Sequence, residues 1–210
     1  MALQLPCSSC GGSVPFPSKA LFYAVCPYCG SMLVRKDLHL ESLGQVALLQ
    51  DDYSPLQIGS EGSCDGKAFV LTGRIRRCWA EGAWNEWFMD FGDEGEAWLA
   101  EAQGFYSVSR PEPLPKPVPN LEQLQVGTVW ELGNKRYQVD DRREAVVEGI
   151  AGQLPFLLKP GEKSVGVDFS GPDGRFATLE FAAGEARLYV GEYLELPDLR
   201  MKNLRELDGW

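Results

Sequence analysis

Four cysteines near the N-terminus have the type and spacing of metal ligands. Cys7 and Cys10 form one Cys-x-x-Cys pair, Cys26 and Cys29 form a second pair fifteen residues later, and glycine follows each pair. A Cys-x-x-Cys turn directs two sulfurs at one ion, and two such turns close a tetrahedral site. We therefore predict a structural Zn²⁺ held by these four thiolates. Iron in the same ligand set, two disulfides and a redox pair are the alternative interpretations.

Aromatic and acidic residues gather in a second stretch, residues 82–106, which holds three of the six tryptophans. Tryptophan faces attract ammonium groups, and neighbouring carboxylates strengthen that attraction. The candidate ligand or partner surface consists of Trp84, Glu86, Trp87 and Trp98. The competing interpretation is that these tryptophans are core residues and cross-strand pairs.

The sequence offers little for catalysis. His39 is the single histidine, and we expect it to be a solvated linker residue, because the metal site already has four ligands. There is no phosphate-binding loop, nucleophile elbow or open metal site. We predict that the protein is not an enzyme.

Alternation of apolar and polar residues predicts that strands position these groups. After a hairpin turn at Asp65-Gly66, the chain alternates through residues 67–79. On this pattern Phe69, Leu71, Gly73, Ile75 and Trp79 share one face, and Thr72, Arg74 and Arg76 lie on the other. Residues 40–110 are therefore predicted to form a meander of about five strands.

A similar pattern returns beyond a run with proline at every second position, Pro111 to Pro119, which we expect to be a semi-rigid spacer. Leu56-Gln-Ile-Gly59 matches Leu124-Gln-Val-Gly127 at an offset of 68, and the turn at Asp65-Gly66 matches Gly133-Asn134. Further matches follow at offsets of 78 and 80. These matches predict a tandem repeat.

The expected fold is mainly β. A four-cysteine zinc ribbon (1–39) precedes two similar small antiparallel β domains, barrel- or sandwich-like, at 40–110 and 121–210, joined by the linker 111–120. The second domain ends in a short C-terminal helix or tail. The net charge of −10 argues against nucleic acid as a partner, because phosphate binding needs positive charge. No leader or long apolar run is visible, so we expect a cytoplasmic protein with no membrane span.

The pattern Trp84-Asn-Glu-Trp87, followed by Trp98-Leu-x-Glu-x-x-Gly104, resembles an uncharacterised bacterial family, domain of unknown function 4178, in tandem copies preceded by a zinc ribbon. The resemblance is good in the first unit and weak in the second, which lacks equivalents of Trp84, Glu86, Trp87 and Trp98. It implies a setting near membrane-stress proteins and polyamine-synthesis enzymes.

These observations predict a non-catalytic, zinc-containing adaptor or scaffold protein. It would mediate protein–protein interaction, with membrane-stress proteins as candidate partners, in a bacterial membrane-stress or polyamine-linked system. The alternatives are a module that binds cationic small molecules such as polyamines, and a nucleic-acid-binding zinc ribbon protein.

Overall fold

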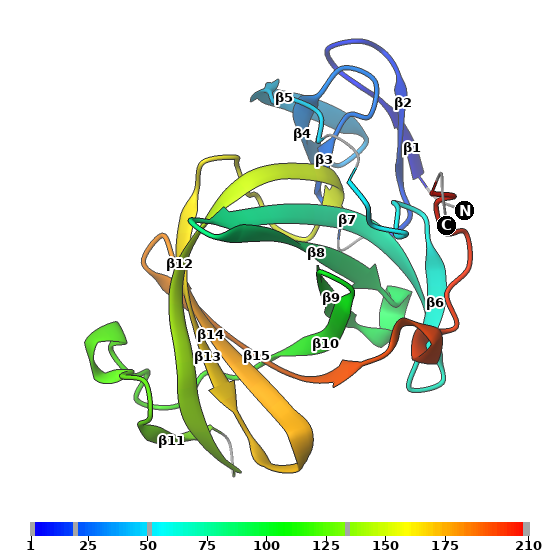
Figure 1. Cartoon of the computed structure of the whole chain (residues 1–210). Coiled ribbons are helices and arrows are strands. Elements are labelled where there is room, and N and C mark those ends of the chain that lie inside the picture. The colour runs from blue at the N-terminus through cyan, green and yellow to red at the C-terminus, as the bar shows by residue number, and fades with distance from the viewer. Residues whose placement is uncertain (1–2, 19–20, 50–51, 133–134, 208–210) are drawn as a thin grey trace.

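The computed structural model describes residues 3–18, 21–49, 52–132 and 135–207, and it confirms a mainly β fold (Figure 1). Its regular structure consists of strands joined by turns and by short 3-10 segments. In the described part of the chain, no helix has the length and apolar character needed to cross a membrane.

The N-terminal module is built from two small sheets. Strands β1 and β2 form one hairpin, and β3, β4 and β5 form an antiparallel sheet. The bounds are β1 (Leu3–Pro6), β2 (Ser13–Phe16), β3 (Tyr23–Val25), β4 (Ser31–Lys36) and β5 (His39–Gln45). The sheet therefore continues past residue 39, where we predicted the module to end, because β5 pairs along the whole of β4.

The rest of the chain forms an eight-stranded closed barrel, with the strand order β12-β13-β14-β15-β10-β9-β8-β7 and a final pairing of β7 with β12 (Figure 1). The first four barrel strands are β7 (Lys67–Trp79), β8 (Gly82–Asp90), β9 (Glu96–Ala102) and β10 (Phe105–Glu112). The other four are β12 (Lys135–Leu154), β13 (Lys163–Ser170), β14 (Arg175–Ala182) and β15 (Glu185–Leu194). Outside the barrel, β6 (Glu61–Cys64) pairs with β7, and β11 (Val129–Leu132) pairs with β12.

The barrel corrects the predicted division into β domains at 40–110 and 121–210. Strand β10 of the first stretch pairs with β15 of the second, and β7 of the first pairs with β12 of the second. A four-stranded meander has two open edges, and joining both meanders edge to edge satisfies the backbone groups of all four edges. The two stretches are therefore halves of one barrel, which we call the first half (β7–β10) and the second half (β12–β15).

The predicted linker 111–120 also differs from a free spacer, because Pro111 and Glu112 belong to β10 and pair with β15. The chain then passes over the outside of the second half through η2 (Leu121–Gln123) to β11. The predicted turn at Gly133-Asn134 lies outside the described residues.

A bulge in β7 changes which side chains share a face. The register with β8 shifts between Leu71 and Gly73, so the alternation restarts there. Phe69 and Leu71 consequently pack outside the barrel, whereas Ile75 packs inside with Phe88. The single face that we predicted for residues 69–79 is wrong for this reason.

Two apolar clusters lie on the outer surface of the barrel, one for each half. In the first half, Leu56 and Leu199 cover Leu71, Met89 and Leu99. In the second half, Leu124 and Leu132 cover a corresponding set of strand residues. The remaining 3-10 segments are η1 (Gly92–Glu94), η3 (Pro172–Gly174) and η4 (Leu196–Leu199), and η4 begins the predicted C-terminal tail. After η4, Lys202 bridges to Glu61 of β6.

Candidate metal centre and barrel interior

The structure brings the four predicted ligands together at one point of the N-terminal module. All four sulfurs lie within 4.8 Å of one another. The Sγ atoms of Cys7 and Cys29 are 3.8 Å apart, as are those of Cys10 and Cys26. A tetrahedral site with metal–sulfur bonds of about 2.3 Å has sulfur–sulfur edges of about 3.8 Å. The arrangement can therefore hold a metal ion with all four positions occupied by protein.

Two equivalent turns aim these sulfurs. In the first, the Gly11 amide donates to the Cys7 carbonyl at 2.9 Å, and in the second the Gly30 amide donates to the Cys26 carbonyl at 3.0 Å. Both glycines have positive φ, 76° and 69°, which a side chain would strain. The glycines that follow each pair in the sequence are thus required by the backbone of the turn.

The thiol environments differ. A hydrogen bond with the Ser31 hydroxyl lowers the pKa of Cys29 to about 6, whereas burial raises the pKa of Cys26 to about 12. A bound metal needs thiolates and its charge favours them, so metal binding would release a proton from Cys26 at neutral pH.

The N-terminal module is fastened to the barrel through β12. The last residues of this long strand, Gln153 and Leu154, pair with Ala24 and Tyr23 of β3. Leu154 and Leu158 are buried in the same cluster as the module's core. The module therefore packs beside the seam where β7 meets β12.

The interior of the barrel carries charged side chains. Arg77 projects from β7 and donates hydrogen bonds to Glu86 at 2.8 Å and to Ser164 at 2.9 Å. It also forms an ion pair with Glu180 at 2.7 Å. These carboxylates raise the pKa of Arg77 although its burial acts to lower it. One guanidinium thus joins β7, β8, β13 and β14 across the interior.

The predicted surface of Trp84, Glu86, Trp87 and Trp98 is divided between the two faces of the sheet. Trp84 donates from Nε1 to Glu86 at 2.9 Å, next to Arg77. Trp98 is almost fully buried and packs on Phe88, with 5.1 Å between ring centroids. Trp87 lies on the opposite, outer face with Leu71 and Met89. The four residues therefore form no single surface, since adjacent positions in a strand point to opposite faces.

Trp87 instead belongs to a buried polar network that the sequence analysis missed. Glu101 accepts hydrogen bonds from Trp87 Nε1 at 3.0 Å, from Ser54 Oγ at 2.7 Å and from Asn85 at 3.2 Å. Asp52, in turn, binds Arg74, Arg76 at 2.6 Å and Asn85 at 3.0 Å. Asp52 to Pro55 had the composition of an ordinary turn, so only the partners from distant strands reveal this network.

The C-terminal segment joins the same network. Arg205 donates to the backbone carbonyls of Asp52 and Ser54. Asn85 and Arg74 are both nearly inaccessible to solvent. These contacts fasten the segments before β6 and after η4 onto the outside of the first half.

Comparison with known proteins identifies one family. The model of the Domain of unknown function (DUF4178) matches residues 57–196, a single stretch that spans both halves of the barrel and more than half of the chain. The predicted tandem copies of this domain are not found. No curated protein matches the chain, and no solved structure matches it.

Proposed function

Because the chain belongs to the Domain of unknown function (DUF4178) family, whose description assigns no activity, we propose a function from its own geometry. The protein acts as a non-catalytic, zinc-containing adaptor, and its N-terminal module docks onto a protein partner. The family resemblance adds the setting, a bacterial membrane-stress or polyamine-linked system in the cytoplasm.

The exposed edge strand β5 carries this proposal. Among the described strands β5 pairs with β4 alone and ends the strand order. Leu38, just before it, is 74% exposed, and Leu43 within it is 41% exposed. An open strand edge with apolar side chains is a template for an added strand from another protein.

A structural role for zinc is supported by the ligand set. Four sulfurs at tetrahedral separations leave no coordination position for a substrate. A module of fewer than fifty residues has little core of its own, so the metal contributes most of its folding free energy. Metal analysis of the purified chain distinguishes zinc from iron.

We also propose that the protein is not an enzyme, because its histidine and its interior carboxylates are poorly placed for acid–base catalysis. His39, the single histidine, lies exposed on β5 beside Lys36 and distant in the sheet from the charged barrel interior. Glu86 and Glu180, two carboxylates of the barrel interior, are both bound to Arg77.

The test is recovery of partners with the tagged full-length chain from a bacterium that encodes it. Wild type is compared with Leu43→Asp on the edge strand and with Val126→Asp, an equally apolar position that is 65% exposed on the barrel. We expect the same protein to be recovered with wild type and Val126→Asp but lost with Leu43→Asp, with one metal ion per chain in all three. Recovery of DNA or RNA, or of a partner indifferent to Leu43→Asp, would overturn the proposal.

A further inference from the structure

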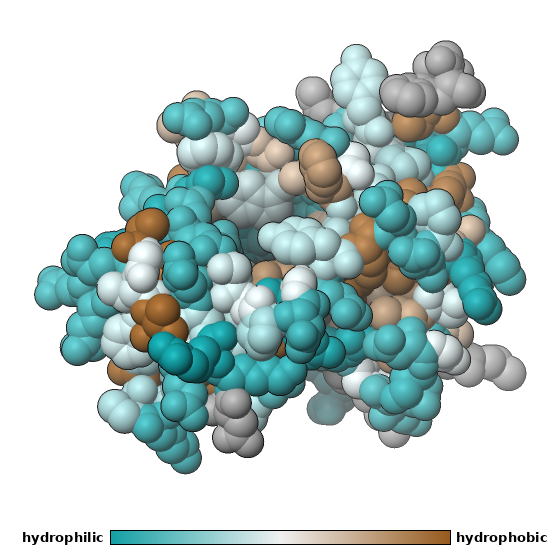
Figure 2. Space-filling model, turned by 60° about the horizontal axis from the view of Figure 1, so that its bottom comes forward, coloured by the Kyte–Doolittle hydropathy of each residue, from teal (hydrophilic) through white to brown (hydrophobic). Residues whose placement is uncertain are grey.

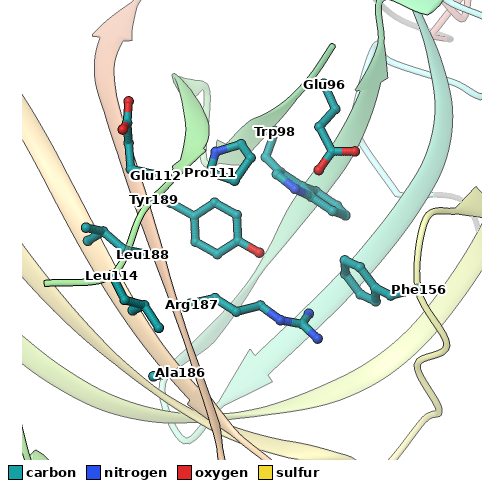
Figure 3. A pocket seen from close by; sticks show the side chains of 10 residues that line it. All are labelled: Glu96, Trp98, Pro111, Glu112, Leu114, Phe156, Ala186, Arg187, Leu188 and Tyr189. Atoms are coloured by element: carbon teal, nitrogen blue, oxygen red, sulfur yellow. The ribbon is translucent and has the colours of Figure 1, made fainter. Parts of the chain in front are cut away.

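A second feature of the molecule, distant from β5, has the construction of a ligand site. It is a cavity of about 330 Å³ on the wall of the barrel, lined by β9, β10, β15 and the loop after β12. Figure 2 shows the molecule from below the view of Figure 1, with a shaded recess near the centre of this mostly hydrophilic face. In Figure 3 the side chains of Glu96, Trp98, Phe156, Arg187 and Tyr189 point toward one another across the cavity.

Aromatic rings form a fixed wall of this cavity. Trp98 packs against Phe88, at 5.1 Å between ring centroids, and against Phe156, at 5.7 Å. Tyr189 faces the same space from β15 (Figure 3), and burial raises its pKa to about 12, so its hydroxyl stays protonated. Such rings present negative faces that attract a cation.

The Glu96 carboxylate is a polar group of the cavity that points toward the aromatic rings and has no partner among the described residues. Within the ranges that the structure describes, no side chain or backbone group donates a hydrogen bond to it and no cation pairs with it. Burial, with the nearby Asp90 carboxylate, raises the pKa of Glu96. A half-buried acid beside a second acid is stabilised in its charged form by a positive ligand.

The one cation of the cavity is already engaged elsewhere. The Arg187 guanidinium lies 4.7 Å from the centroid of the Phe156 ring, and it forms an ion pair with Glu185 at 3.3 Å. Arg187 thus shows that a ring of this wall accepts a planar cation, while the Trp98 ring lies on the Glu96 side of the cavity.

The neighbouring interior adds negative charge. Deeper in the barrel the single positive charge of Arg77 faces two carboxylates, Glu86 and Glu180. Asp168 of β13, an exposed residue, accepts a hydrogen bond from Thr178 at 2.7 Å and adds a further negative charge. Carboxylates behind a low-dielectric wall favour a ligand of positive charge over one of negative charge.

We propose that this cavity binds a small organic cation, namely a protonated amine with a hydrocarbon body. Its ammonium group lies beside Glu96 at the Trp98 ring, and its hydrocarbon part lies along the rings of Phe156 and Tyr189. This site differs from the predicted Trp84 and Glu86 surface, whose carboxylate is already bound to Arg77 and Trp84.

Three probes of one shape and different charge test the proposal. The metal-loaded full-length chain is titrated with n-butylammonium, n-butanol and n-butyrate, while the indole N–H signal of Trp98 is followed by NMR. We expect n-butylammonium to shift this signal with a Kd in the millimolar range and the other two probes to leave it unchanged. Glu96→Gln should weaken amine binding about 10-fold or more, whereas Glu112→Gln, whose carboxylate points away from the cavity in Figure 3, should not.

Several results would overturn the inference. Equal binding of butyrate and butylammonium would mean that charge does not select the ligand, and butyrate binding lost in Arg187→Gln would make the cavity an anion site. Amine binding unchanged in a folded Glu96→Gln variant would remove Glu96 as the counter-ion. If Glu96→Gln does not fold, the wild type alone decides. A Trp98 signal that stays unshifted at an amine concentration 50-fold above the millimolar range would also overturn the inference. Leu43→Asp on β5 should not affect amine binding. The amine site and the adaptor surface are therefore tested independently of each other.

Discussion

The two halves of the barrel share a backbone plan but differ in how their outer surfaces are covered. In the first half the Gly59 amide donates to the Leu71 carbonyl at 2.8 Å, and in the second the Gly127 amide donates to the Val139 carbonyl at 2.8 Å. Both glycines have positive φ, 88° and 86°. Strand β7 has a bulge just after Leu71, and strand β12 has a bulge just after Val139. Residues 68 apart thus occupy matching places.

The side chains at other matching positions diverge. Arg74 is buried and binds Asp52 and Asn85, whereas Arg142, at the same offset, is exposed and donates to the Leu121 carbonyl at 3.1 Å. The cover of the first half is fastened by buried charges, and that of the second by apolar packing and backbone bonds. The same backbone arrangement therefore carries two kinds of cover. The outer face of a strand can be covered by buried ion pairs or by apolar side chains, provided that the covering segment supplies matching groups.

The largest expected effect is that loss of the metal lowers hydrogen-exchange protection at the β7–β12 seam and leaves it unchanged at the β10–β15 seam. The N-terminal module packs beside the β7–β12 seam, where β3 pairs with the end of β12. Structural four-cysteine zinc sites contribute about 10–16 kcal/mol of apparent binding free energy at neutral pH. In Cys26→Ser we expect loss of the metal, loss of hydrogen-exchange protection in residues 3–49 and at the end of β12, and retained protection in β10 and β15. Full protection of residues 3–49 in a metal-free chain would contradict this expectation.

Replacing the matched arginines should show that the covers differ. Arg74→Leu removes the buried guanidinium from Asp52 and leaves the Asn85 Oδ1 atom without its donor, so we expect a loss of about 3 kcal/mol of unfolding free energy. Arg142→Leu, on an exposed side chain, should cost about 0.5 kcal/mol or less. Denaturant unfolding of both variants measures the difference. Equal losses would mean that the two halves are fastened alike.

Truncating the matched core residues should show what the halves share. Leu71 and Val139 are both fully buried in the outer clusters. We expect Leu71→Ala to cost about 3 kcal/mol and Val139→Ala about 2 kcal/mol, in proportion to the carbons removed. Hydrogen exchange should rise beneath residues 52–60 in the first variant and beneath 121–132 in the second. Increased exchange beneath both covers in either variant would show that the halves open together.

The effect of pH should have opposite signs at Asp52, which covers the first half, and at Asp168 in the second half. Although burial acts to raise it, the pKa of Asp52 is lowered by Asn85 and by the guanidiniums of Arg74 and Arg76. A lowered pKa means stability that is present above the ordinary value near 3.8 and is lost as pH falls through the folded value. Asp52→Asn should therefore be less stable than wild type at pH 7, by about 2 kcal/mol, with a difference that shrinks below about pH 4.

Desolvation inside the barrel raises the pKa of Asp168, an exposed residue of the second half, so its ionised form costs a small amount of stability above that raised value. Asp168→Asn can still accept the Thr178 hydrogen bond. We expect this variant to be more stable than wild type at pH 7 and to become equal to it as pH falls toward 3.8. Thermal unfolding from pH 3 to 8 measures both variants, and a loss at pH 7 in Asp168→Asn would reverse the assignment.

Local sequence patterns were sufficient for several features. The spacing of Cys7, Cys10, Cys26 and Cys29 predicted a cluster that the structure assembles, because the two turns are local. The hairpin at Asp65-Gly66 has positive φ at both residues, as its composition requires. The fold class followed from alternation in the same way. The single face of residues 69–79 failed, because a bulge at Thr72 leaves no mark in the pattern of residue types.

The sequence by itself thus determined the cluster of four cysteines, the strand content and the matching glycine positions 68 residues apart, since each depends on residues close in the chain or on repeated spacing. Only the tertiary structure decided that the halves close into one barrel, that Trp87 is bound by Glu101, and that Glu96 meets Trp98 and Tyr189 at a cavity. Those outcomes depend on which strand edges pair and on which face each side chain takes after a bulge. Both are set by contacts between segments far apart in the chain, which periodicity cannot specify.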